Sequence, residues 1–301
     1  MKIQTLSLHP YENPLITGAV RSGVLLHLTD EHNFSGWGDI APLPKWSLET
    51  LADSITQINQ EQEKIKKIEW TKETCLQELI ALNLLPSLSF GLESALLSIL
   101  DPTSDLKIQT SALFMGTPQE ILKQADLRKN EGYISAKLKV GHLSFEEALP
   151  LIQQLKDSFH LRIDVNCAWE TKDALRFFSN FPLDTFDYIE EPFQNPHDLA
   201  LFPHPLAVDE SFPKNLSLSQ LESFPTLKAL IYKPTIQGGI AQCITLHEWA
   251  KRKKIDLILS SSFESAVGLS HIANMARRLS LSSPIGTGTC HFFTNQGAIP
   301  L

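Results

Sequence analysis

Hydrophobic and polar positions along the chain change their rhythm at about residue 107. Before this point, two stretches that alternate like β-strands precede three segments with the apolar spacing of helices. Strands followed by helices are typical of an α+β unit. The strands are expected around Lys2–Leu8 and Gly23–Thr29, and the helices at Leu48–Lys66, Thr71–Leu84 and Ser89–Leu100. Ser47 is the expected N-cap of the first helix, and Leu15–Gly23, which contains two glycines, is expected to form a mobile loop.

Beyond residue 107, strand-like runs alternate with helix-like runs, a pattern that predicts a parallel sheet with helical crossovers. Seven or eight such strands within roughly 180 residues favour a closed barrel over an open doubly wound sheet. The strands are expected at Ile108–Met115, Ile134–Val140, Leu161–Asn166, Asp187–Glu190, Leu206–Asp209, Ala229–Lys233 and Ile255–Ser260. The helices are expected at Gln119–Lys129, Phe145–Ser158, Lys172–Asn180, Ile240–Lys253 and Ala266–Leu279.

Composition narrows the function classes. The chain has 301 residues, 43% of them hydrophobic, and a net charge of -8 that argues against a nucleic-acid partner. We find no segment that is long and apolar enough to span a membrane, and no signal-peptide pattern at the amino terminus. The four cysteines are far apart and form no Cys-x-x-Cys pair, so reduced thiols and a cytoplasmic location are expected.

Charged residues recur at the carboxyl ends of the predicted strands. In the segment Leu161–Asn166, alternation places Arg162, Asp164 and Asn166 on one face, and we expect Arg162 to be buried beside an internal acid or the lysines. Asp164, Glu190 and Asp209 end three consecutive strands, which a barrel would bring to one rim. Clustered carboxylates repel each other without a cation, and oxygen ligands suit Mg²⁺. The sequence therefore predicts a magnesium site.

Two of these acids have an acidic neighbour. Glu190 precedes Glu191, and Asp209 precedes Glu210, with the members of each pair pointing in opposite directions along a strand. Spacing alone does not tell which member of each pair is the ligand.

Three lysines occupy the same predicted rim. Lys137 and Lys139 share one strand face, and Lys233 ends another strand roughly across the barrel. Lysines are rarely buried without partners, and crowding two of them favours the neutral amine on one, which can then act as a base. The alternative for Lys137 is a purely structural ion pair with an internal acid.

The order of these motifs resembles that of the enolase superfamily, in its muconate-lactonising subgroup. Each motif alone is weak, but the ordered set is specific: Lys-x-Lys at 137–139, Asp-x-Asn at 164–166, Glu-Glu-Pro at 190–192, Asp-Glu-Ser at 209–211 and Lys-Pro at 233–234. Further stretches are similar to the superfamily's dehydratases of menaquinone biosynthesis, namely residues 36–44, 86–91, 164–169 and 260–265. The resemblance covers almost the whole chain.

The resemblance implies an α/β fold, a modified (β/α)7β TIM-like barrel with an N-terminal α+β capping domain. The cap would comprise residues 1–104 and the barrel 105–285, with the tail 286–301 returning to the cap. It also selects Asp164, Glu190 and Asp209 as the Mg²⁺ ligands.

The same resemblance assigns roles to other residues at the rim. Lys139 matches the catalytic acid/base and Lys233 matches the lysine on the opposite face. The residues expected at the substrate are Lys137, Asn166, Ser260 and Ser262.

The implied activity is the Mg²⁺-dependent dehydration of a small-molecule carboxylate. A succinyl-hydroxycyclohexadiene carboxylate would become 2-succinylbenzoate through an enediolate intermediate. Lys139 would remove the proton beside the carboxylate and then assist loss of hydroxide as water, while Lys233 stays protonated.

Other activities stay open at this point. Within the superfamily these are N-acylamino-acid racemisation, muconate cycloisomerisation and dipeptide epimerisation, although Gly286–Thr289 lacks the acid pair that the dipeptide epimerases carry. A Schiff-base lyase using Lys233 would leave the three carboxylates without a role. A non-catalytic barrel scaffold predicts a degraded rim, but no rim position has been lost.

Overall fold

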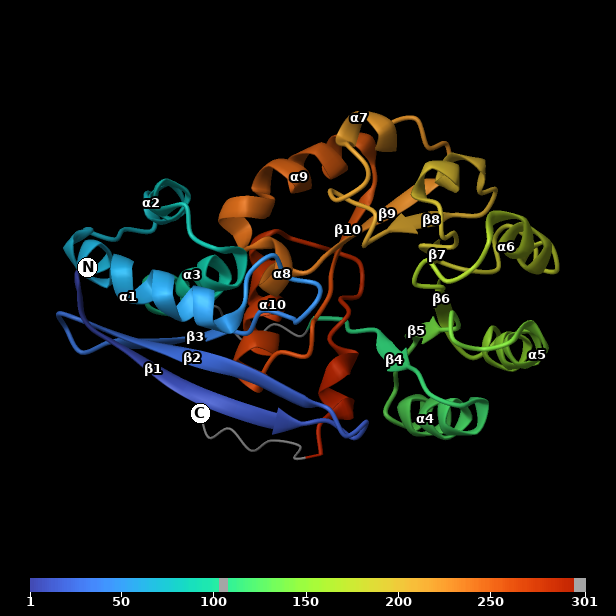
Figure 1. Cartoon of the computed structure of the whole chain (residues 1–301), viewed down its shortest axis with the longest axis horizontal. Coiled ribbons are helices and arrows are strands. Elements are labelled where there is room, and N and C mark those ends of the chain that lie inside the picture. The colour runs from blue at the N-terminus through green and yellow to red at the C-terminus, as the bar shows by residue number, and fades with distance from the viewer. Residues whose placement is uncertain (103–107, 295–301) are drawn as a thin grey trace.

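The computed structural model describes residues 1–102 and 108–294, which form two parts with separate hydrophobic cores (Figure 1). The first part, the cap, contains an antiparallel sheet of order β1-β2-β3. Two of its three helices pack on this sheet and the third packs on one of these helices, around a core that includes Leu26, Ile58 and Trp70. The elements are β1 (Ile3–Pro14), β2 (Val20–Asp30), β3 (Ser35–Ile40), α1 (Leu51–Lys67), α2 (Cys75–Leu82) and α3 (Pro86–Leu100).

The third strand of the cap is one that the hydrophobic pattern did not predict. β3 contains Gly36 and Gly38, and glycine is depleted in strands. Both glycines are required by the close approach of α3, because a Cβ at Gly36 would lie 2.1 Å from the Ala95 carbonyl oxygen. At Gly38 the corresponding distance, to the Gly91 carbonyl oxygen, is 1.8 Å. Direct packing of the β3 backbone on the α3 backbone therefore explains the glycines in a segment that pairs antiparallel with β2.

Two local predictions in the cap are wrong. The Leu15–Gly23 stretch is a loop only in its first half, since β2 begins at Val20 and its first residues pair with the end of β1. Helix α1 is capped by Thr50, which forms a capping box with Asp53. Ser47 instead accepts a hydrogen bond from the backbone N–H of Leu43 through its side chain (2.9 Å).

The second part is a curled parallel sheet of seven strands in the order β4 to β10, surrounded by helices (Figure 1). The strands are β4 (Ala112–Phe114), β5 (Ser135–Lys139), β6 (His160–Asp164), β7 (Tyr188–Glu190), β8 (Leu206–Val208), β9 (Leu227–Tyr232) and β10 (Asp256–Leu259). The α-helices are α4 (Pro118–Asn130), α5 (Phe145–Leu155), α6 (Thr171–Phe178), α7 (Leu218–Leu221), α8 (Pro234–Gln237), α9 (Ile240–Lys253) and α10 (Ala266–Arg278). Two 3₁₀ helices complete this part, η1 (Pro196–Leu201) and η2 (Gly288–Phe292).

A short bridging segment, Ile285–Gly286, closes the barrel. Gly286 pairs in parallel with Ser260 next to β10, and Ile285 pairs in parallel with Thr110 next to β4. The Gly286 N–H donates to the Leu259 carbonyl oxygen (2.8 Å). The expected TIM-like barrel with seven full strands and a final closing strand is therefore confirmed.

The cap and the barrel touch through helices and through the last described residues. Helix α3 of the cap packs against α8 and α9 of the barrel. After η2, Phe293 pairs antiparallel with Leu15 at the tip of the β1–β2 hairpin. The Thr294 N–H donates to the Pro14 carbonyl oxygen (3.0 Å). The predicted boundary between residues 104 and 105 lies outside the described residues.

A histidine at this interface predicts loss of stability in acid. His271 on α10 donates to the Trp37 carbonyl oxygen of β3 (2.7 Å), and burial, with a contribution from Arg278, lowers its pKa to about 4. An unfolded chain titrates its histidines near pH 6.5, so between about pH 6.5 and 4 only the unfolded state binds this proton. The free energy of unfolding should fall by up to about 3 kcal/mol over that range.

Urea unfolding at pH 7 and pH 4.5 measures this effect. His271→Gln keeps an N–H donor but does not titrate, so its drop should be smaller than that of the wild type. Glu93 lines a cavity at this interface together with His271, and the difference between the wild type and His271→Gln separates the effect of His271 from that of such neighbouring groups. His32→Gln, at an exposed histidine of the cap, is the matched control and should behave like the wild type. Equal drops in the wild type and His271→Gln would contradict the prediction.

Among the described residues, no helix has both the length and the apolar character needed to cross a membrane.

Candidate active site

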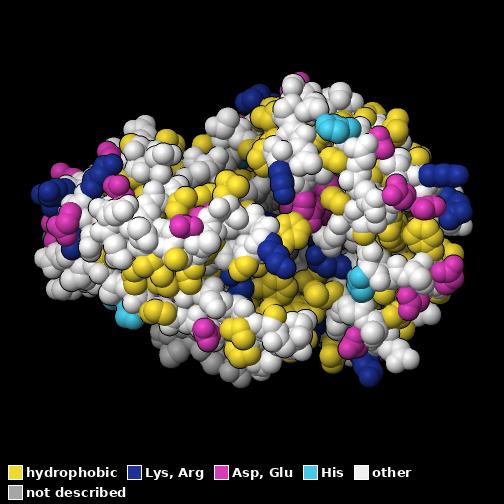
Figure 2. All heavy atoms as spheres, viewed as in Figure 1, with side chains coloured by type: hydrophobic (Ala, Val, Ile, Leu, Met, Phe, Trp, Pro, Cys, Tyr) yellow, Lys and Arg dark blue, Asp and Glu magenta, His cyan; other side chains and the backbone are white. Residues whose placement is uncertain are grey.

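The strands β4 to β10 surround, toward their carboxyl ends, one cavity of about 190 Å³. It opens where the cap meets the barrel, and Figure 2 shows a hollow there with hydrophobic atoms inside it and both basic and acidic side chains around it. The parallel strands dictate this position, since their carboxyl ends all meet at one rim. Of the predicted site residues, those lining the cavity are Lys137, Lys139, Asn166, Glu190, Lys233, Ser260 and Ser262. The structure thus brings most of the predicted set together.

Lys137 lies between two carboxylates at the bottom of the rim. Its Nζ is 2.7 Å from Glu190 Oε1 and 2.8 Å from Asp164 Oδ2. Burial alone would lower the pKa of Lys137, but the two carboxylates outweigh it and raise that pKa well above its ordinary value. Lys137 is therefore a cation that compensates buried negative charge, as the structural alternative for this residue required.

Lys139 is the more exposed of the two lysines on β5, and its amine is held from two sides. Its Nζ donates to Asn166 Oδ1 (3.0 Å) and lies 3.4 Å from Asp164 Oδ2. The Asn166 amide in turn donates to Glu210 Oε1 (2.9 Å). Asn166 therefore links a lysine to a carboxylate within the protein, which is more than the substrate contact that the sequence predicts. The expected repulsion between Lys137 and Lys139 is offset by the acids that both lysines contact.

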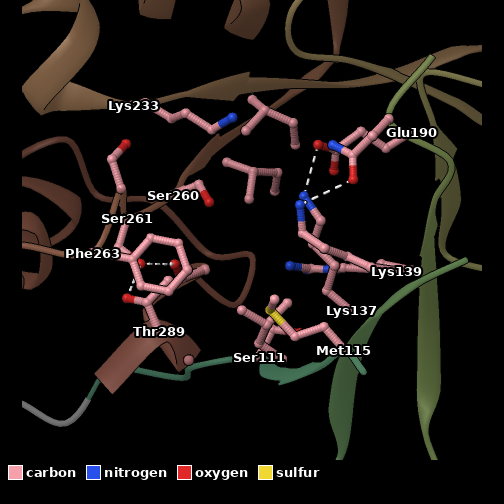
Figure 3. Close-up of a pocket in the computed structure, with 18 of the residues that line it drawn as sticks. Ser111, Met115, Lys137, Lys139, Glu190, Lys233, Ser260, Ser261, Phe263 and Thr289 are labelled. Carbon is pink, nitrogen blue, oxygen red and sulfur yellow. Dashed lines mark hydrogen bonds and ion pairs between the residues drawn. The ribbon is translucent and has the colours of Figure 1, made fainter. Parts of the chain in front are cut away.

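Lys233 enters the cavity from the wall that faces Lys137 and Lys139 (Figure 3). Its ammonium forms an ion pair with Asp209 and lies 5.5 Å from the centroid of the Trp46 ring. Burial would lower the pKa of Lys233, but Asp209 and Glu210 together raise it above its ordinary value. The surroundings of Lys233 therefore favour its charged form.

Three carboxylates approach one another closely at the rim. Oxygens of Glu190, Asp209 and Glu210 all lie within 4.8 Å of one another. Burial and the nearby Asp164 raise the pKa of Glu190 well above its ordinary value, and burial and Asp209 raise that of Glu210. One buried oxygen of Glu190 and one of Glu210 have no hydrogen-bond partner among the described residues. Unpartnered buried carboxylate oxygens of this kind fit a divalent cation such as Mg²⁺.

Asp164 stands apart from that group of three. Its carboxylate contacts Lys137 and Lys139, and these two lysines together outweigh the effect of burial and lower the pKa of Asp164 to about 2. Glu210, and not Asp164, is the third residue with an oxygen within 4.8 Å of oxygens of Glu190 and Asp209. Spacing could not separate Asp209 from Glu210, and the structure turns both toward the rim.

In the other ambiguous pair, Glu190 lines the cavity and Glu191 does not. Glu191 points away from the cavity and accepts hydrogen bonds from the Asp209 N–H and from the backbone and hydroxyl of Ser211 (2.7 to 2.8 Å). Burial raises the pKa of Glu191 to about 7 although the Ser211 bonds oppose it. Glu191 thus braces the loop that carries Asp209.

Arg162 is buried as expected, but its acidic neighbour Asp187 is partly exposed rather than internal. It is 3% exposed, and its guanidinium donates to the Pro284 carbonyl oxygen (2.7 Å). Asp187 lies 3.4 Å away, and the Tyr188 ring lies beneath the guanidinium at 5.1 Å.

Sequence reasoning missed the walls of the cavity. Leu43 and Trp46 reach it from the cap, and Phe263 reaches it from the loop after β10. A polar wall is formed by Ser111, Ser261 and Thr289, with the Ser261 and Thr289 hydroxyls 2.6 Å apart (Figure 3). Of these wall residues, only Leu43, Ser261 and Phe263 lie in the stretches 36–44 and 260–265 that carried the resemblance, and the others had no signal in the sequence.

The fold and the site together define a capped barrel enzyme whose rim combines clustered carboxylates with facing lysines. The chain belongs to the enolase C-terminal domain-like family, whose model matches residues 120–290. The model of the MenC N-terminal domain matches residues 16–99. The two matches cover the barrel and the cap respectively.

The chain is also similar to curated proteins with the same named activity. The chain is 30% identical to the o-succinylbenzoate synthase of Haemophilus influenzae, over 92% of this chain and 84% of that protein. It is 29% identical to the o-succinylbenzoate synthase of Yersinia enterocolitica, over 98% of this chain and 93% of that protein. With the MenC match, these relatives indicate an enzyme of the lyase class.

Solved structures share the fold. The o-succinylbenzoate synthase of Thermosynechococcus elongatus, solved with Mg in its active site, is 26% identical with a TM-score of 0.74, over 97% of this chain and 95% of that one. The L-Ala-D/L-Glu epimerase of Bacillus subtilis superposes with a TM-score of 0.81 at 18% identity, over 98% of this chain and 92% of that one.

Proposed function

We propose that the protein is an o-succinylbenzoate synthase, which dehydrates a succinyl-hydroxycyclohexadiene carboxylate to 2-succinylbenzoate with the help of Mg²⁺. The observation that carries the proposal is the arrangement of Lys139 and Lys233 on facing walls of one cavity, beside clustered carboxylates. The named relatives and the match of the cap to the MenC N-terminal domain support it.

The metal would be held by Glu190 and Asp209, with Asp164 as the third ligand that the resemblance selects. Glu210 is the alternative third ligand, since it lies within 4.8 Å of the other two. When bound, Mg²⁺ would supply positive charge that stabilises the negative charge developing on the substrate carboxylate. Lys137 supports this arrangement by compensating Asp164 and Glu190 from below.

Lys139 is the residue that we assign to proton transfer. Its amine borders the cavity, and Asn166 and Asp164 fix its direction. In its neutral form it takes the proton next to the substrate carboxylate. The resulting ammonium then returns that proton to the departing hydroxide, so that water leaves and the ring becomes aromatic.

Lys233 acts through its charge. It stays protonated beside Asp209 and faces the ring from the side opposite Lys139, where a fixed cation stabilises developing negative charge. The apolar wall residues Leu43, Ile231 and Phe263 fit a hydrocarbon ring, and the hydroxyls of the polar wall fit the oxygens of a second carboxylate.

The direct test is an assay of the purified protein with Mg²⁺ on the cyclohexadiene substrate, followed by the appearance of the aromatic product. A panel of N-acylamino acids and dipeptides tests the second candidate, a racemase or epimerase, which the facing lysines also favour because two bases on opposite faces of one carbon invert it. Dehydration that exceeds every racemisation in kcat/KM supports the proposal. Racemisation without dehydration would overturn it.

A further inference from the structure

Arg21 at the start of β2 is a buried cation that bonds to backbone oxygens of three segments. It is 4% exposed, although arginine is rarely buried this fully. Nη1 donates to the Pro42 carbonyl oxygen (2.8 Å) and to that of Ser22 (3.3 Å), and Nη2 donates to that of Ala41. Nε donates to the carbonyl oxygen of Ser262 (3.2 Å), which belongs to the barrel. One side chain thus joins a cap strand, a cap turn and the barrel rim.

Two buried carboxylates near Arg21 hold the same rim segment. Asp39 accepts from the Ser265 N–H (2.8 Å), and Glu264 accepts from the Ser262 N–H (2.7 Å). Both carboxylates lie close enough to Arg21 for its charge to favour their ionised forms and so to lower their pKa values, although burial raises them more strongly. The backbone of the rim segment 262–265 is therefore held by three buried charged side chains: Arg21 and Glu264 bond to Ser262, and Asp39 bonds to Ser265.

The segments that Arg21 joins are two walls of the catalytic cavity. Directly after Pro42, the cap turn carries Leu43 and Trp46, and the rim segment carries Ser262 and Phe263. Trp46 lies over the Lys233 ammonium and is still 49% exposed. The backbone next to it is strained, because Lys45 has a positive φ of 73°.

We propose that Arg21 is a positioning residue: it holds the cap turn so that Trp46 covers Lys233, and it holds the facing rim wall at the matching distance. Its effect on catalysis rests on the proposed dehydration. Arginine suits this role because its planar fork presents five donors in fixed directions, which one compact ammonium cannot reproduce.

The test compares Arg21→Met and Arg21→Lys with a matched control. Arg278→Met removes another arginine at the cap–barrel interface, one that contacts Asp101 and the Leu97 carbonyl oxygen and does not line the catalytic cavity. We expect both Arg21 variants to lower kcat/KM by roughly tenfold or more, because a cation–π contact contributes a factor of about 3 to 30 and the rim wall moves as well. Arg278→Met should change stability but leave kcat/KM within about twofold of the wild type, as expected for distant sites.

A double-mutant cycle identifies the path of the effect. Trp46→Leu should itself lower kcat/KM, Trp46→Phe should lower it less, and Arg21→Met should cost less in the Trp46→Leu background than alone. Fully additive losses would overturn the proposal, because Arg21 would then act independently of Trp46. Arg21→Met would also overturn it if it lost no more activity than Arg278→Met.

A second readout does not depend on activity. Acrylamide quenching of Trp46, taken as the difference between each protein and its Trp46→Phe counterpart, should increase when Arg21 is replaced by Met or Lys. If Arg21→Met does not fold, Arg21→Lys carries the test, since it keeps the charge and loses the fork. Unchanged quenching in the folded Arg21 variant would overturn the proposal. An inactive wild type with increased Trp46 quenching would refute the dehydration but leave the positioning role of Arg21 supported.

Discussion

Lys139→Arg is expected to lower kcat/KM for the dehydration by roughly 10²- to 10⁴-fold, the range for loss of a general base. Arginine keeps the positive charge near Asp164 but does not lose its proton at any pH the protein tolerates, so no neutral base is available. Lys233→Arg should be far less damaging, because the surroundings of Lys233 favour a permanent cation and arginine is one. Steady-state kinetics of both variants on the same substrate measure the contrast.

Proton exchange separates this prediction from a general loss of structure. Wild type and Lys233→Arg should exchange the proton beside the carboxylate in deuterated water, whereas Lys139→Arg should not. If Lys233→Arg is as inactive as Lys139→Arg, Lys233 transfers a proton or needs its own shape. That result would favour the two-base racemase over the dehydratase.

Loss of the metal site is expected to abolish activity entirely. Glu190→Gln and Asp209→Asn should each remove measurable turnover and weaken Mg²⁺ binding in calorimetric titration, as should Asp164→Asn if the resemblance selects the ligands correctly. EDTA should inactivate the wild type, and added Mg²⁺ should restore it. Retained activity in EDTA, or a wild-type rate from Asp164→Asn, would refute the metal assignment.

Glu210→Gln is the matched control in this series, because Glu210 lies in the same carboxylate group but was not selected as a ligand. We expect it to retain most of its Mg²⁺ affinity, while Asp164→Asn loses it. The opposite ranking would make Glu210 the third ligand. Stability should also differ: Glu190→Gln relieves repulsion from Asp164, whereas Asp164→Asn leaves Lys137 and Lys139 with less compensation.

Long elements with a strong period were predictable from the sequence. Helix α9 has the predicted bounds Ile240–Lys253, because an apolar stripe of period 3.6 runs between Gly239 and a left-handed residue at Lys254. Strand bounds were less predictable: β4 has three residues where Ile108–Met115 was predicted, whereas β9 begins two residues before the predicted Ala229. A positive φ at Asn166 turns the backbone away, and β6 ends at Asp164, two residues before its predicted end.

The chemistry of the rim was predictable for a different reason: parallel strands bring their ends together whatever the loops do. That reasoning located the lysines and the carboxylates. It could not orient Glu210 or foresee that Asn166 bridges Lys139 to Glu210, because both depend on loop backbone after the strand ends. The roles of Arg21 and Trp46 depend on how the cap docks, and Arg21 meets Ser262 across 241 positions of sequence.

The Ile285–Gly286 closure has a consequence for synthesis on the ribosome. Every full strand of the barrel is made before this segment, so the edges of β4 and β10 have no partner there until residue 286 has emerged. Leu15, at the tip of the cap hairpin, is made early and has no strand partner until Phe293 follows. Open edges attract other strands, and pairings so distant along the chain form slowly. The nascent chain therefore exposes two unpaired strand edges, and with them a risk of aggregation, from the time β10 is made until Ile285 and Gly286 have joined the sheet.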